Sequence, residues 1–321
     1  INYFSYDYSG PKDGEPFGVS AVIADCPWNS DHKLLMLNLQ TEKIDFSKAP
    51  DTNLVLLIDV SGSMDEPEKL PLLQEALGML VGELGEKDRV SIVTYASSNE
   101  IVLDGVPGSN KEKIMRAING LEAYGATNGG EGIINAYKLA EKSFIKGGNN
   151  RVIIASDGDF NVGITSESEL HDLITSEKEK GIFLSVLGFG YGNYSDARME
   201  TLADDGNGNY SYIDSIREAK KVLVEELGAN LVTVAKDVKL QVEFNPEYVS
   251  AYRQIGYENR QMAAEDFSDD TKDGGEIGAG HSVTVLYELI PAEKILNDNR
   301  CIVHICGSNS FMSILNLCAA L

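Results

Sequence analysis

The chain has 321 residues, of which 43% are hydrophobic and 24% charged, a balance that predicts a folded protein with cores for two domains. Its 50 acidic against 27 basic residues give a formal net charge of −23, which would repel a phosphate backbone, so we expect no nucleic-acid partner. The most apolar long segment, residues 301–321, is interrupted by polar residues, so we expect no membrane span in this chain.

The first 50 residues predict a β segment. Residues 17–24 and 33–39 are strand-like and are separated by a turn region rich in Pro, Asn and Asp. Two strands are too few for independent stability, so we expect this segment, residues 1–50, to pair with β structure elsewhere in the chain.

Residues 51–229 predict an α/β domain. Four short apolar runs, at 54–58, 89–95, 151–155 and 182–189, have the composition of strands covered on both faces of a sheet. Apolar residues at helical spacing between or after them predict four helices, marked by Leu73, Leu77, Leu80 and Leu84; by Ile114, Ile118 and Leu121; by Ile133, Tyr137, Ala140 and Phe144; and by Ile216, Ala219, Leu223 and Leu227.

One strand of this domain is expected to run against the others. Residues 101–103 follow the 89–95 strand after a gap too short for a crossover helix, which predicts an antiparallel hairpin at one edge. The fold class is therefore α/β, with a doubly wound, mostly parallel central sheet and one antiparallel edge strand.

After residue 227 the pattern becomes β-type again. Residues 232–244, 249–256 and 281–290 alternate apolar and polar positions, whereas the acidic, Gly-rich stretch 266–280 predicts a loop. We expect residues 230–290 to join residues 1–50 in one smaller β-rich domain, into which the α/β domain is inserted. Residues 291–321 are an atypical tail to which the sequence assigns no element.

Oxygen-bearing side chains gather on three loops of the α/β domain. Asp59, Ser61 and Ser63 follow the 54–58 strand, Thr127 precedes a predicted helix, and Asp157 follows the 151–155 strand. Ligands of open α/β sheets bind at the carboxyl ends of strands, and hard cations prefer oxygen donors. Two carboxylates with neutral hydroxyls predict a divalent cation, Mg²⁺ or else Mn²⁺ or Ca²⁺, that still accepts a carboxylate from outside.

These five residues resemble the metal-ion-dependent adhesion site of von Willebrand factor type A domains. The resemblance covers residue 54 to about residue 228, and all five motif positions are filled. It implies that Ser61, Ser63 and Thr127 contact the ion directly or nearly so, and that Asp59 and Asp157 act mostly through water.

The flanks resemble bacterial von Willebrand factor A proteins of largely unassigned role. The segments that carry this resemblance are Asn2–Phe4, Cys26–Trp28, Ile255–Arg260 and Asp273–His281. Because the chain begins at Ile1, we expect a processed leader and a place in the cell envelope or outside the cell, with lipid anchorage as one form of attachment.

The expected function is metal-dependent protein binding, for adhesion or assembly, and not catalysis. A partner's Asp or Glu would complete the coordination of the ion, and loops 64–67, 125–130 and 160–165 would supply specificity. One alternative is a scaffold subunit that acts through its β domain. The enzymatic alternative is a phosphohydrolase with Asp59 as nucleophile, but such enzymes carry a second acid two residues later, where this chain has Ser61, and the sequence shows no suitably placed lysine.

Overall fold

The computed structural model describes the chain in segments, and it divides into two units. The described residues are 6–12, 15, 17–42, 50–126, 132–158, 166–190, 196–225, 233–257, 261–263, 266, 275–292, 300–306 and 313–318. One unit, Ser47–Leu231, is the α/β unit; the other, the β unit, combines Ile1–Phe46 with Val232–Leu321.

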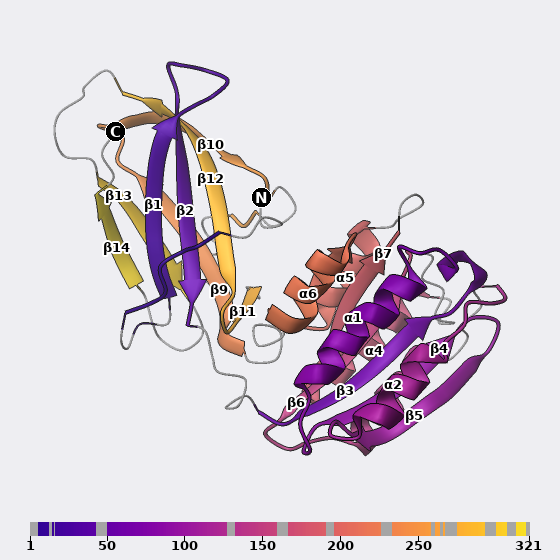
Figure 1. Ribbon diagram of the computed structural model, residues 1–321. Coiled ribbons are helices and arrows are strands. Elements are labelled where there is room, and N and C mark those ends of the chain that lie inside the picture. Colours follow the sequence, from indigo (N-terminus) through magenta and orange to yellow (C-terminus); the bar gives the residue numbers. More distant parts are fainter. Residues whose placement is uncertain are drawn as a thin grey trace. The chain divides into compact units, whose positions relative to one another are not determined.

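The α/β unit is built on a six-stranded sheet of order β5-β4-β3-β6-β7-β8 (Figure 1). All neighbouring pairs are parallel except β4 and β5, which are antiparallel. The strands are β3 (Thr52–Asp59), β4 (Arg89–Tyr95), β5 (Asn99–Pro107), β6 (Asn149–Ser156), β7 (Ile182–Phe189) and β8 (Tyr210–Ile213). The predicted mostly parallel sheet with one antiparallel edge is therefore confirmed.

Apolar side chains cover both faces of this sheet. Val55 and Leu57 of β3 belong to a buried cluster with residues of α3, α4 and α5, while the alternating residues Leu54, Leu56 and Ile58 are buried as well. Successive side chains of a strand point to opposite faces, so this second set faces the side that α1 and α2 cross in Figure 1. The helices are α1 (Leu70–Glu83), α2 (Lys111–Asn119), α3 (Gly132–Lys142), α4 (Glu167–Glu179), α5 (Asp196–Asp205) and α6 (Ile216–Lys220).

The direction of winding reverses at β3. From β3 the chain proceeds to β4 and β5 on one side, and then returns to place β6, β7 and β8 on the other. The loops that leave the carboxyl ends of β3 and β6 therefore diverge, and such a switch point is where sheets of this type open a crevice for ligands.

The structure contains two helices that the sequence did not predict, and one that is shorter than predicted. Helix α4 buries only Leu170, Ile174 and Glu177, too narrow a stripe to produce a clear helical period. Helix α5 was likewise not predicted. The last predicted helix ends early, because α6 passes at Lys221 into a π-helical segment, η3 (Lys221–Glu225).

The β unit contains two four-stranded sheets, ordered β1-β2-β12-β10 and β11-β9-β13-β14. The strands are β1 (Phe17–Asp25), β2 (Lys33–Thr41), β9 (Thr233–Phe244), β10 (Val249–Ile255), β11 (Gly275–Gly278), β12 (Ser282–Pro291), β13 (Arg300–Cys306) and β14 (Ser313–Cys318). β2 pairs antiparallel with β12 along its whole length, so the two chain ends form one sheet. The predicted insertion of the α/β domain into a β-rich domain made from both ends is confirmed.

The core of the β unit lies between β9 and the sheet that contains β2. Leu35, Leu37 and Leu39 alternate along β2 and pack with Val285 and Tyr287 of β12, while β9 contributes apolar residues to the same cluster. This period-two burial is the one that the sequence pattern predicted.

Two predictions for the C-terminal part were wrong. The stretch 266–280, expected to be a loop, contains the short strand β11, which pairs irregularly with β9. After residue 290, where the sequence assigned no element, β13 pairs with β9 and β14 pairs with β13. Within the described part of the chain, no helix is both long and apolar enough to cross a bilayer.

Candidate metal centre

Asp59 ends β3 and is fully buried at the switch point. Its Oδ1 accepts a hydrogen bond of 2.8 Å from the Ser61 amide, and its Oδ2 accepts one of 3.2 Å from the Ser156 hydroxyl at the end of β6. Burial raises the pKa of the Asp59 carboxyl to about 6; the hydrogen bonds from Ser61 and Ser156 oppose this rise, and the nearby charge of Asp157 adds to it.

The loop after β3 turns two hydroxyls toward each other. Ser61 Oγ and Ser63 Oγ lie 3.0 Å apart, with Ser61 buried and Ser63 exposed. The loop continues into a short 3₁₀ turn, η2 (Gly62–Met64), which the completely buried Met64 side chain fixes to the core. Magnesium ligands stand at about 2.1 Å in an octahedron, so neighbouring ligands are about 3.0 Å apart, which matches the separation of these hydroxyls.

The second predicted loop runs beside the first. The Gly62 amide donates to Gly125 O at 3.0 Å, and the Tyr124 amide donates to Val60 O at 2.8 Å. Thr127, the predicted ligand on this loop, lies outside the described residues, as do residues 127–130 and 160–165 of the loops expected to supply specificity.

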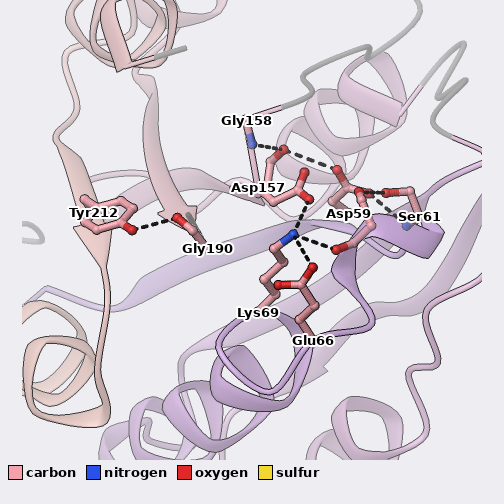
Figure 2. A network of polar contacts seen from close by, with 10 residues as sticks. Asp59, Ser61, Glu66, Lys69, Asp157, Gly158, Gly190 and Tyr212 are labelled. Carbon is pink, nitrogen blue, oxygen red and sulfur yellow. Dashed lines mark hydrogen bonds and ion pairs between the residues drawn. The ribbon is translucent and has the colours of Figure 1, made fainter. Parts of the chain in front are cut away.

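Asp157 follows β6, next to β3 in the sheet, so the two predicted carboxylates come from neighbouring strands (Figure 2). Its side chain is 7% exposed, and its Oδ2 contacts the Lys69 ammonium at 3.1 Å. Its Oδ1 has no hydrogen-bond partner among the residues that the structure describes. A buried, unpaired carboxylate oxygen is costly, so this atom is available to a ligand.

The sequence did not predict a role for Lys69, and the statement that no lysine is suitably placed was wrong. Lys69 directly precedes α1, and its ammonium contacts Ser63 O at 2.8 Å, Asp157 Oδ2 at 3.1 Å and Glu66 Oε1 at 3.4 Å (Figure 2). Burial by itself would lower the pKa of Lys69, but the hydrogen bond and charge of Asp157, together with Glu66, raise it above its ordinary value. The ammonium therefore stays charged at neutral pH.

The stem of Lys69 lies against a glycine at the end of β7. Gly190 has a φ of +81°, and a Cβ built there would be 2.4 Å from Lys69 Cε. The Tyr212 hydroxyl of β8 donates to Gly190 O at 2.6 Å, which holds this peptide beside the lysine (Figure 2). Neither contact has a local sequence signal, because each joins residues far apart in the chain.

The described donors at this edge are carboxylates and hydroxyls, the set that suits a small hard cation. Among the described residues no three His, Cys, Asp or Glu side chains are grouped as a metal site would require. Any metal held here would therefore depend on Ser61 and Ser63 in addition to Asp59 and Asp157.

Comparison with known proteins agrees with this architecture. Residues 53–225 match the family profile of the von Willebrand factor type A domain, residues 1–36 a profile described as von Willebrand factor, and residues 229–301 one described as the C-terminal part of uncharacterized protein YfbK. YfbK of Escherichia coli K12 is 48% identical over 297 residues, covering 90% of this chain and 52% of the relative. An uncharacterized protein of Synechocystis is 28% identical over 193 residues, covering 59% of this chain and 44% of the relative.

The chain thus spans about half the length of these curated relatives. Among solved structures, a von Willebrand factor type A protein from Catenulispora acidiphila shares the fold with a TM-score of 0.52 at 14% identity, covering 96% of this chain and 75% of that one. Since the domain profile matches more than half of the residues, the chain belongs to the von Willebrand factor type A domain family.

Proposed function

We propose that this protein binds a protein partner through a divalent cation, Mg²⁺ or Mn²⁺ or Ca²⁺, held by Asp59, Ser61, Ser63, Thr127 and Asp157. The observation that carries the proposal is the meeting of two hydroxyls 3.0 Å apart with two carboxylates from neighbouring strands at the switch point. The neutral hydroxyls leave the cation short of negative charge, so an Asp or Glu of the partner completes its coordination.

The surroundings of Asp59 favour binding over catalysis. A phosphohydrolase nucleophile needs a free oxygen facing its substrate, whereas both oxygens of Asp59 accept hydrogen bonds and its side chain is fully buried. Lys69 is a group that such an enzyme would use, but its ammonium is taken up by Ser63 O and two carboxylates. Magnesium-dependent turnover of a phosphate ester by the purified protein would revive the enzymatic alternative.

Calorimetric titration with Mg²⁺ and Mn²⁺ tests the metal site. We expect binding to the wild-type protein and a loss of at least about tenfold in affinity for Asp157→Asn, because the ion loses one of two anionic groups. Asp104→Asn is the matched control, since Asp104 lies in an exposed ion pair with Lys142 in the same unit. Absence of heat with both metals, or equal affinities for wild type and Asp157→Asn, would refute the proposed site.

Capture of partners from cell-envelope extracts tests the second half of the proposal. We expect capture by the full chain to depend on the divalent cation, to disappear in EDTA, and to fail with Asp157→Asn. Capture that survives both changes would favour the scaffold alternative, in which the β unit makes the contact. An envelope or extracellular location is part of the proposal, and fractionation of cells that express the complete gene tests it.

A further inference from the structure

Lys69 places a permanent positive charge inside the candidate metal centre. Only 9% of its side chain is exposed, although lysines are rarely buried without a partner. An ammonium has three N–H donors, and three oxygens surround this one, from Ser63, Asp157 and Glu66. The ammonium is therefore held by oxygen donors much as a small bound cation would be (Figure 2).

The path of the Lys69 stem is built by the surrounding structure. Any side chain at Gly190 would meet Lys69 Cε, Cγ and Cδ at 2.4–3.2 Å, so the absence of a Cβ makes room for the lysine. The hydrogen bond from Tyr212 to Gly190 O fixes the peptide that forms this wall. A side chain free to swing in solvent would need neither feature.

This arrangement affects a carboxylate that the metal would use. Asp157 gives Oδ2 to Lys69, while Oδ1 is without a partner among the described residues. A divalent ion and an ammonium repel each other, and both are stabilised by the same carboxylate. Occupation by one therefore weakens the hold on the other.

We propose that Lys69 is an internal counter-ion that stabilises Asp157 in the metal-free protein and competes with the divalent cation for it, so that Lys69 sets the metal affinity of the site. This inference rests on the proposed function, because it requires that the site binds a metal. In the metal-free state Lys69 neutralises Asp157, and metal entry moves the ammonium away from that carboxylate. The site thereby binds metal more weakly than its oxygen donors alone would allow.

The test compares Lys69→Met, which keeps the length of the stem but removes the charge, with wild type. Calorimetry with Mn²⁺ and Mg²⁺ is expected to give a Kd lower by about tenfold or more for Lys69→Met, since one like charge is gone. In EDTA the variant is expected to melt at a lower temperature than wild type, and saturating Mn²⁺ to raise its melting temperature by more. Lys142→Met, which removes the charge of an exposed ion pair in the same unit, is the matched control and is expected to change neither quantity.

A second measurement covers the case in which Lys69→Met does not fold. In ¹⁵N-labelled wild-type protein, the Lys69 ammonium signal is expected to shift or disappear on addition of Mg²⁺, as its contact with Asp157 is lost. A Kd for Lys69→Met equal to or weaker than that of wild type, or an ammonium signal unchanged at saturating Mg²⁺, overturns the inference and leaves the proposed metal site standing. Absence of metal binding in wild type and Lys69→Met alike overturns both.

Discussion

Replacing Gly190 by alanine is expected to destabilise the α/β unit through two separable effects. The first is the backbone: at a φ of +81° a residue with a Cβ is strained by about 1–2 kcal/mol. The second is the contact, because a Cβ at 2.4 Å from Lys69 Cε forces the lysine or the strand end to shift, and such overpacking costs about 1–3 kcal/mol. Together they predict a loss of about 2–5 kcal/mol in the free energy of unfolding.

Gly147 provides the matched control for this change. Its φ is +76°, and a Cβ there would meet nothing within 4 Å, so Gly147→Ala carries the backbone strain without the contact. We expect Gly147→Ala to cost about 1–2 kcal/mol, and Lys69→Ala to bring the cost of Gly190→Ala down to that level. For a unit of this size, each kcal/mol corresponds to roughly 2–4 °C in Tm.

Urea unfolding in EDTA, followed by circular dichroism at 222 nm, is the suitable assay. All helices of the described residues belong to the α/β unit, so the helical signal reports on that unit and not on the β unit. If Gly190→Ala costs no more than Gly147→Ala, or if Lys69→Ala leaves its cost unchanged, the packing of the lysine against this glycine is refuted.

Two further predictions follow from shifted pKa values. The Asp59 carboxyl has its pKa raised to about 6 from 3.8, so its contribution to stability falls as pH rises between these values. Asp59→Asn is therefore expected to stabilise the metal-free protein at pH 7, by up to about 3 kcal/mol, while abolishing metal binding; unfolding in EDTA at pH 4 and pH 7 checks this, and a destabilised variant would contradict it. Glu288 in the β unit has its pKa lowered from 4.5 to about 2 by hydrogen bonds from His32, Arg253 and Trp28, so its stabilisation is present above pH 4.5 and is lost as pH falls toward 2. The fluorescence of Trp28, the only tryptophan, is expected to report this acid transition, and Glu288→Gln to remove it; an unchanged transition in that variant would assign it to other groups.

Sequence patterns predicted the parts of the fold that depend on short-range regularity. The apolar run of β3 and the short gap between β4 and β5 each determine a local outcome, and both were confirmed. Helix α4 escaped prediction because its buried face is narrow, and β11 because a four-residue strand in a Gly-rich, acidic stretch leaves no alternation to recognise.

The candidate site divides in the same way. Asp59, Ser61 and Ser63 stand on one loop, and the adjacency of β3 and β6 follows from the topology, so the meeting of Asp59 with Asp157 could be anticipated. Lys69 could not be, because its significance depends on a contact with Asp157 across 88 residues and on close packing against Gly190. Tertiary contacts of this kind leave no periodic trace in the chain.

The pairing of β2 with β12 imposes an order on biosynthesis. Every strand of the six-stranded sheet has been translated by Ile213, whereas Leu39 must wait for Val283 before its sheet can form. Chains fold domain by domain as they emerge, and contacts between distant residues form slowly. On the ribosome the inserted unit therefore reaches its native state first, while the β1–β2 hairpin remains exposed as an incomplete sheet edge until the C-terminal strands arrive.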